Sequence, residues 1–204
     1  MVRSFPRTAC PGLVALLCFF GAPAVGTGQT ISPTEAQIVS AIEGRANEAI
    51  AFLERIVNMN SGSMNFDGVR AVGDVLRAEF DALGFETEWV DGAPFERAGH
   101  LVARREGGSG PHLLLIGHLD TVFEPDSPFQ TFVRGDNNTA VGPGVVDMKG
   151  GNVVILEALR GLDSAGALED MTITVVLTGD EERSGRPLDL ARVDLKVAAE
   201  AADI

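Results

Sequence analysis

Residues 113–121 read Leu-Leu-Leu-Ile-Gly-His-Leu-Asp-Thr, an apolar run followed at once by polar residues. Four large apolar side chains in a row are typical of a strand that is buried on both faces, as in a parallel sheet. A second such run, Met-Thr-Ile-Thr-Val-Val-Leu at residues 171–177, is rich in β-branched residues. A helical pattern at residues 149–162 separates the two runs, and this alternation predicts an α/β fold.

The chain before residue 113 continues the alternation. Ser32-Pro33-Thr34-Glu35 is a helix start with a capping box, and a polar, glycine-containing break follows at residues 58–65. A second helix is expected from about Asp67 to Leu83, and short strands at residues 86–90 and 100–104. The stretch 188–204 fits neither pattern clearly. Apolar residues at helical spacing mark the first helical region: Ile38, Ile42, Ala46, Ile50, Leu53 and Val57.

The first residues have the pattern of an export signal. Arg3 and Arg7 precede an apolar run at residues 13–20, and Ala22-Pro23-Ala24 is a small-x-small cleavage site. The run is too short to span a bilayer comfortably, so no stable membrane span is expected after cleavage. We therefore predict a Sec-type signal peptide at residues 1–24, a linker at 25–31 and an extracytoplasmic (periplasmic or secreted) domain at 32–204. A lipoprotein anchor at Cys18 is the alternative, although Leu17 before it fits poorly.

Charge and cysteine content exclude several classes of protein. The chain has 204 residues and a formal net charge of -13, which disfavours nucleic acid as a partner because phosphate backbones repel acidic surfaces. Both cysteines, Cys10 and Cys18, lie in the predicted signal peptide. The remaining chain therefore cannot use a disulfide or a thiol nucleophile.

His118 and Asp120 form the first polar cluster, directly after the apolar run. In an extended segment their side chains point to the same side. A neutral imidazole is a good zinc ligand, and a nearby carboxylate can hold its other ring nitrogen and fix the tautomer. A histidine that is merely hydrogen-bonded at a strand end is the alternative.

The second cluster is Gly-Pro-Gly-Val-Val-Asp-Met-Lys-Gly-Gly at residues 142–151. Asp147 stands just before the predicted helix, where an N-cap role is the structural alternative. The flanking glycines allow close backbone approach, and a carboxylate has two oxygens with which to bridge two cations. Lys149 also stands out, because the chain contains only two lysines.

The third cluster, Gly179-Asp180-Glu181-Glu182, follows the second apolar run. Adjacent acids repel one another and are tolerated in solvent or around a cation. A solvated acidic turn is one interpretation. In the other, one glutamate binds metal and another takes a proton from water. One histidine with several carboxylates suits zinc or a similar divalent ion better than calcium, which prefers oxygen ligands alone.

The order of these three motifs resembles the M20 family of metallopeptidases, and in particular its glutamate carboxypeptidases. The resemblance implies an α/β catalytic domain with a mixed, mostly parallel sheet flanked by helices. It also implies two divalent metal ions, most simply zinc, with cobalt or manganese as alternatives. Carried over by position, His118, Asp147 and Glu182 resemble metal ligands, with Asp147 as the bridging carboxylate. Glu181 resembles the catalytic base, and Asp120 the residue that orients the histidine.

The implied activity is hydrolysis of a peptide or amide bond of a C-terminal or N-acylated amino acid, with a small peptide or N-acyl amino acid as substrate. The family's site also uses a further carboxylate and a second histidine from later in the chain, and a smaller lid domain. Only His100 and His112 remain, and both precede the first motif. We therefore expect the N-terminal part of a catalytic domain without the lid, with a homodimer possible for a full-length parent.

Two alternatives of other classes accompany this prediction. A non-catalytic protein could keep the fold and bind a ligand, although His118, Asp147, Glu181 and Glu182 are all intact. A nucleotide-binding α/β domain would need a glycine loop that cradles phosphate after the first strand, and the sequence has none there.

Overall fold

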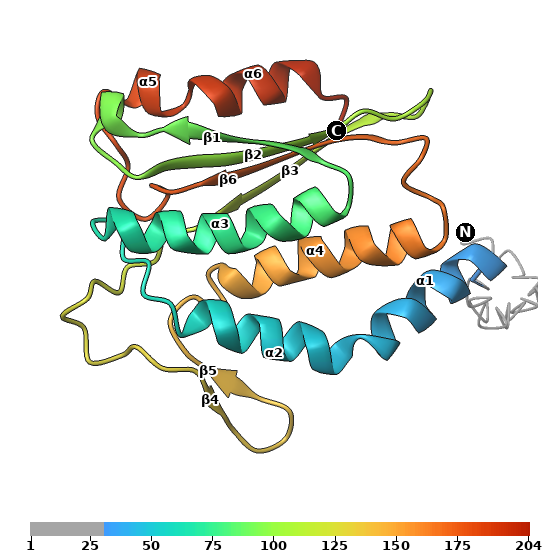
Figure 1. Cartoon of the computed structure of the whole chain (residues 1–204), viewed down its shortest axis with the longest axis horizontal. Helices are drawn as coiled ribbons and strands as arrows, with labels where there is room; N and C mark the ends of the chain where they lie inside the picture. The colour runs from blue at the N-terminus through green and yellow to red at the C-terminus, as the bar shows by residue number, and fades with distance from the viewer. Residues whose placement is uncertain (1–30) are drawn as a thin grey trace, which may run out of the picture. The chain divides into compact units, whose positions relative to one another are not determined.

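Four strands form the central sheet of the computed structural model, which describes residues 31–204. Their order across the sheet is β1-β2-β6-β3, and Figure 1 shows them stacked side by side. Each predicted strand is present to within two residues at either end. The bounds are β1 Glu86–Asp91, β2 Gly99–Arg105, β3 His112–His118 and β6 Thr172–Thr178. The predicted signal peptide and linker, apart from Ile31, lie outside the described residues.

The sheet is mixed, as predicted, but only β3 and β6 pair in parallel. β1 with β2 and β2 with β6 are antiparallel, so the described sheet is not mostly parallel. A short connection joins β1 to β2 and permits antiparallel pairing, whereas β3 reaches β6 through a helical crossover, as parallel strands require. In the strand order, β3 lies at one edge of the described sheet and pairs with β6 on one side. Its apolar run is half-buried rather than buried on both faces, and Ile116 is 54% exposed.

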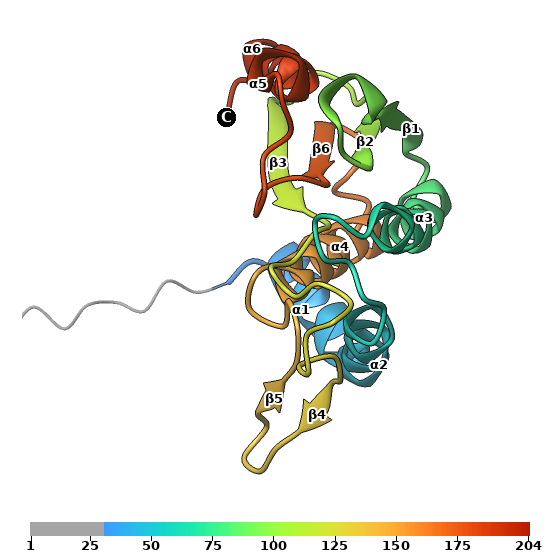
Figure 2. The same ribbon diagram turned by 90° about the vertical axis from the view of Figure 1, so that its left-hand side faces the viewer.

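Helices cover both faces of the sheet (Figure 1). α3 (Phe66–Ala82) and α4 (Lys149–Ser164) pack on one face. The ambiguous stretch after residue 187 forms two short helices, α5 (Leu188–Ala191) and α6 (Val193–Ala201), and α6 packs on the other face. Figure 2 shows this layering end-on, with the sheet between the two sets of helices.

Side chains alternate between these two faces along each strand, as the pleat requires. Val102 and Val176 pack toward Ala198 of α6. Their neighbours point the other way and form the main core with α3 and α4. That core includes Val69, Val72, Leu76 and Phe80 of α3, Leu156 and Leu159 of α4, and Leu101, Ala103, Ile173, Val175 and Leu177 of the sheet.

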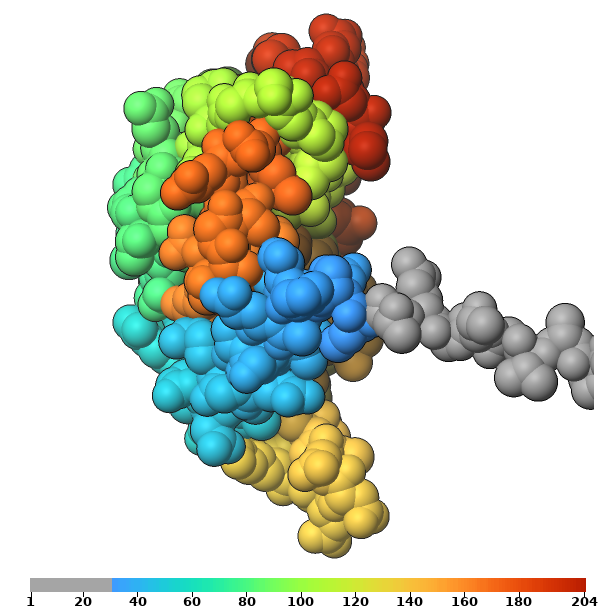
Figure 3. Space-filling view, turned by 90° about the vertical axis from the view of Figure 1, so that its right-hand side faces the viewer, coloured from blue at the N-terminus to red at the C-terminus, as the bar shows by residue number. Residues whose placement is uncertain are grey.

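The first helical region is divided in two at Arg45, giving α1 (Pro33–Gly44) and α2 (Ala46–Val57). The predicted capping box is present at the start of α1. Both helices pack against α4, and Arg45 at the break forms an ion pair with buried Glu157 of α4 at 2.9 Å. In Figure 3 the N-terminal helices lie against the segment around the end of α4, where Gln37 donates to the Ser164 carbonyl.

Two features lie outside the layers. Two-residue strands β4 (Val133–Arg134) and β5 (Ala140–Val141) form a hairpin that projects from the α2 end of the unit (Figure 2). Along the outer edge of β3, the backbone N–H of Leu114 donates to the Ile204 carbonyl at 2.9 Å. Within residues 31–204, no helix has both the length and the apolar character needed to cross a membrane.

Candidate metal centre

Three elements bring one potential ligand each to a single point. His118 is the last residue of β3, Asp147 precedes α4 by two residues, and Glu182 follows β6. Their candidate ligand atoms all lie within 4.8 Å of one another. The carboxyl ends of parallel β3 and β6 share one sheet edge, and the crossover helix begins at that edge, where open α/β sheets bind ligands.

The His118 ring is buried and hydrogen-bonded on both nitrogens. Nδ1 lies 3.0 Å from the Asp120 carbonyl oxygen and 3.4 Å from a carboxylate oxygen of the same residue. Nε2 lies 2.8 Å from Asp147 Oδ1. Burial alone would lower the pKa of His118, but the carboxylates of Asp120 and Asp147 outweigh it and raise the pKa to about 9. Nδ1–H can donate to Asp120, which leaves Nε2 as the atom to ligate a cation.

Asp120 is fully buried, and four groups of the site lie against its carboxylate. Besides the His118 ring, it accepts from Ser63 Oγ at 2.6 Å and from the backbone N–H groups of Glu181 and Glu182, both at 3.1 Å. Burial alone would raise the pKa of Asp120, yet these donors and the His118 ring lower it below its ordinary value. Asp120 therefore stays ionised and fixes the loop that carries both glutamates.

Asp147 does not cap α4. Met148 occupies the N-cap position, and no side chain there makes a capping hydrogen bond. The Asp147 side chain is 71% exposed, and its contact with His118 Nε2 orients its carboxylate toward the site. The N-cap role that the sequence offered as an alternative for Asp147 is therefore wrong, and its carboxylate is available to a cation.

The three acids after β6 have three different surroundings. Asp180 is fully buried and pairs with the Arg192 guanidinium at 2.7 Å, so it belongs to an internal ion pair rather than to a solvated cluster. Glu182 lies beside Asp147, and partial burial together with that carboxylate raises its pKa. Glu181 is exposed and lines a cavity of about 450 Å³ together with His118 and Asp147.

The other two histidines are structural. His100 is buried and stacks on Phe95. Its Nδ1 accepts from the Gly179 N–H at 3.1 Å, so its Nε2–H donates to the Ala191 carbonyl. His112 lies at the other end of β3 and contacts Thr174 Oγ1 at 2.9 Å. Neither belongs to the ligand group, as the motif positions predicted.

Sequence reasoning missed two residues that hold the site in place, Ser63 and Asn152, and singled out a third, Lys149, without giving it a role. Ser63 was assigned only to a polar break, yet it donates to Asp120. Asn152 of α4 donates to the His118 carbonyl at 2.7 Å. The Lys149 ammonium is fully buried and donates to the carbonyls of Ile56 and Met59. Only Lys149 carried a signal in the sequence, namely the rarity of lysine.

One imidazole nitrogen and two carboxylates are a donor set that fits zinc or a similar divalent cation. A glycine makes this arrangement possible. A Cβ on Gly117 would lie 2.5 Å from Asn152 Oδ1 and 2.8 Å from Leu177 Cδ2. A Cβ at residue 117 would therefore force the Asn152 side chain to shift, and Asn152 is the residue that donates to the His118 carbonyl.

Comparison with known proteins agrees with this site. The sequence pattern of peptidase family M20/M25/M40 matches residues 114–200, which include all three motifs. Carboxypeptidase G2 of Pseudomonas sp. is 36% identical over 150 residues, which is 73% of this chain and 36% of that protein. Succinyl-diaminopimelate desuccinylase of Gluconacetobacter diazotrophicus is 35% identical over 126 residues, or 59% of this chain and 32% of that protein.

The fold is also that of solved peptidases. Human carnosine dipeptidase 1 superposes with a TM-score of 0.67 at 16% identity, over 82% of this chain and 39% of that one. The chain thus spans about a third of the length of the curated relatives that it matches. By its motifs, its sheet and these matches, the chain belongs to the M20/M25/M40 peptidase family and contains part of that family's catalytic domain.

Proposed function

We propose that this chain is part of a metal-dependent hydrolase that cleaves a peptide or amide bond of a C-terminal or N-acylated amino acid. The observation that carries the proposal is the convergence of His118, Asp147 and Glu182 within 4.8 Å at the carboxyl ends of two parallel strands. Two divalent ions, with zinc preferred over cobalt or manganese, are part of the proposal. The predicted signal peptide makes an extracytoplasmic location part of it as well.

His118, Asp147 and Glu182 would together hold the two ions. A divalent cation bound here would polarise an amide carbonyl and bring the pKa of a water molecule toward about 7. The chain's own residues provide the proton chemistry. Glu181 is exposed to the cavity that it shares with His118, so its carboxylate can accept a proton from water and pass it to the leaving nitrogen. Asp120 holds the Glu181 backbone in place for this transfer.

The test combines zinc content, measured by elemental analysis, with hydrolysis of N-acyl-glutamate. Glu181→Gln should retain zinc and lose turnover by roughly 10²- to 10⁴-fold, because an amide cannot accept the proton. His118→Ala and Glu182→Gln should instead lose zinc. His112→Ala, which alters a histidine outside the site, is the matched control and should retain both properties.

Two results would count against the proposal. Turnover that survives Glu181→Gln would remove Glu181 as the base. A wild-type protein that holds zinc but hydrolyses no N-acyl amino acid or dipeptide would favour the non-catalytic binding protein instead.

A further inference from the structure

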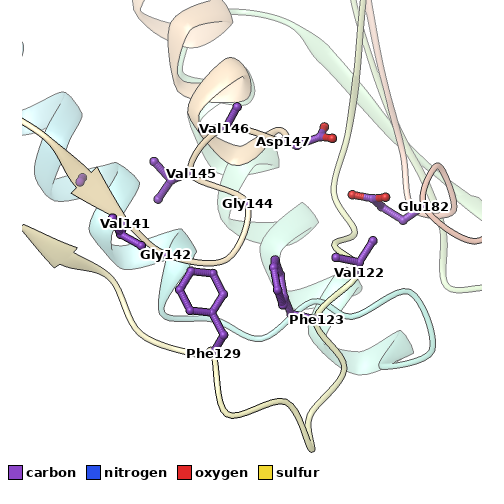
Figure 4. Close-up of a pocket in the computed structure, with 11 residues that line it drawn as sticks. Val122, Phe123, Phe129, Val141, Gly142, Gly144, Val145, Val146, Asp147 and Glu182 are labelled. Carbon is purple, nitrogen blue, oxygen red and sulfur yellow. The ribbon is translucent and has the colours of Figure 1, made fainter.

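An apolar pocket of about 460 Å³ opens directly beside the candidate metal centre (Figure 4). Asp147 and Glu182 form one side of it, and the phenyl rings of Phe123 and Phe129 form another. The two rings contact each other at a centroid distance of 4.8 Å. Any group bound here would therefore sit next to the atoms that we assign to metal binding.

Three segments outside the main sheet build most of the walls. They are the turn after β3, the loop around Phe129, and residues 140–146, which run from β5 toward α4. Three valines on these segments are exposed: Val122 at 60%, Val141 at 55% and Val146 at 90%. Apolar side chains gathered at a polar site indicate a surface that binds an apolar group.

Charge around the pocket restricts what can enter. Among the residues that line it, the charged ones are Asp147 and Glu182, and no lysine or arginine is present. The neighbouring cavity contains Arg192, but that guanidinium is already paired with buried Asp180. An anionic group on the substrate would therefore find no lysine or arginine among the residues that line the pocket.

We propose that this pocket binds an uncharged aromatic or branched aliphatic group that the substrate carries next to the scissile amide. The proposal rests on the proposed hydrolase function and adds the substrate class. The β4–β5 hairpin and the loop at Phe129 then determine specificity, while the strand ends supply the chemistry.

The experiment uses ligands that do not depend on metal. Benzamide, acetamide and succinamate are titrated into the ¹⁵N-labelled, EDTA-treated chain, and backbone N–H shifts are followed by NMR. Benzamide should bind at least about tenfold more tightly than acetamide, because the ring removes apolar surface from water. Its largest shifts should fall on Gly142 and Val145, and succinamate should bind no better than acetamide.

Matched variants locate the effect. Val141→Asp places a charge in the pocket wall and should abolish the preference for benzamide, whereas Val197→Asp, at an equally exposed valine of α6, should leave it unchanged. Phe129→Ala should reduce the preference for benzamide as well. If Phe129→Ala fails to fold, the exposed variant Val141→Asp still tests the proposal. Equal affinity for benzamide and acetamide, shifts elsewhere, or insensitivity to Val141→Asp would each overturn the proposal.

A zinc titration of the same sample separates this proposal from the proposed function. Failure to bind zinc, with the benzamide preference intact, would count against the hydrolase but leave the apolar pocket in place. Zinc binding without a preference for benzamide would overturn the proposed apolar pocket but leave the proposed hydrolase function in place.

Discussion

At the scale of single residues, Asp120 organises the site more than its motif indicated. The sequence predicted one contact, to His118, which lies 3.4 Å from the Asp120 carboxylate. The two carboxylate oxygens also accept hydrogen bonds from Ser63 Oγ and from the backbone N–H groups of Glu181 and Glu182. Asp120→Asn would turn an amide N–H₂ toward donors. We expect zinc affinity to fall about 10- to 100-fold and the free energy of unfolding to drop by about 1–3 kcal/mol. Isothermal titration and urea unfolding measure these changes. Asp126→Asn, at an exposed aspartate, is the control, and equal zinc affinity in the two variants would show that Asp120 does not orient the ligands.

At the scale of elements, Lys149 joins the start of α4 to the end of α2. Its ammonium donates to Ile56 O at 2.9 Å and to Met59 O at 2.7 Å, and burial lowers its pKa to about 8. Its side chain also packs under Gly144, whose φ of +76° favours glycine. Lys149→Ala should cost about 3 kcal/mol of unfolding free energy, because it opens a cavity and removes the donor to the Met59 carbonyl, whereas the Ile56 carbonyl still accepts from the Met59 N–H. Lys149→Met should cost less, since it keeps the volume. Urea unfolding, with exposed Lys196→Ala as reference, distinguishes the two contributions. A loss no larger than that of Lys196→Ala would refute this role.

At the scale of the whole domain, the candidate ligands come from three elements, so a metal would tie β3, β6 and the start of α4 together. A ligand that binds only the folded state stabilises it by about 2.7 kcal/mol at 100 times its Kd. For a domain of this size, zinc should therefore raise the Tm by roughly 5–10 °C. Calorimetry with and without zinc measures the shift, which EDTA should reverse. His118→Ala should abolish it and His112→Ala should not. A shift of equal size in both variants would place the zinc elsewhere.

The strands and the long helices could be predicted because their signals are local. Apolar runs, helical spacing and the capping box at Ser32 all depend on neighbours in the chain, and α3, α4 and β6 begin within two residues of the predicted positions. The break at Arg45 was not predicted, and the ion pair that Arg45 makes there joins it to Glu157, 112 residues away in the sequence. The β4–β5 hairpin escaped because two-residue strands are too short to show a period.

The sequence by itself determined the chemical identity of the candidate site, since each motif places its own residue at the end of a strand or before a helix. Tertiary structure alone decided which of these residues meet. It inserted β6 between β2 and β3, directed Asp180 to Arg192 and Glu182 to Asp147, and brought Ser63 to Asp120. It also assembled the apolar pocket from three separate segments. The physical reason is that strand order and side-chain contacts depend on packing between distant segments, which no local pattern encodes.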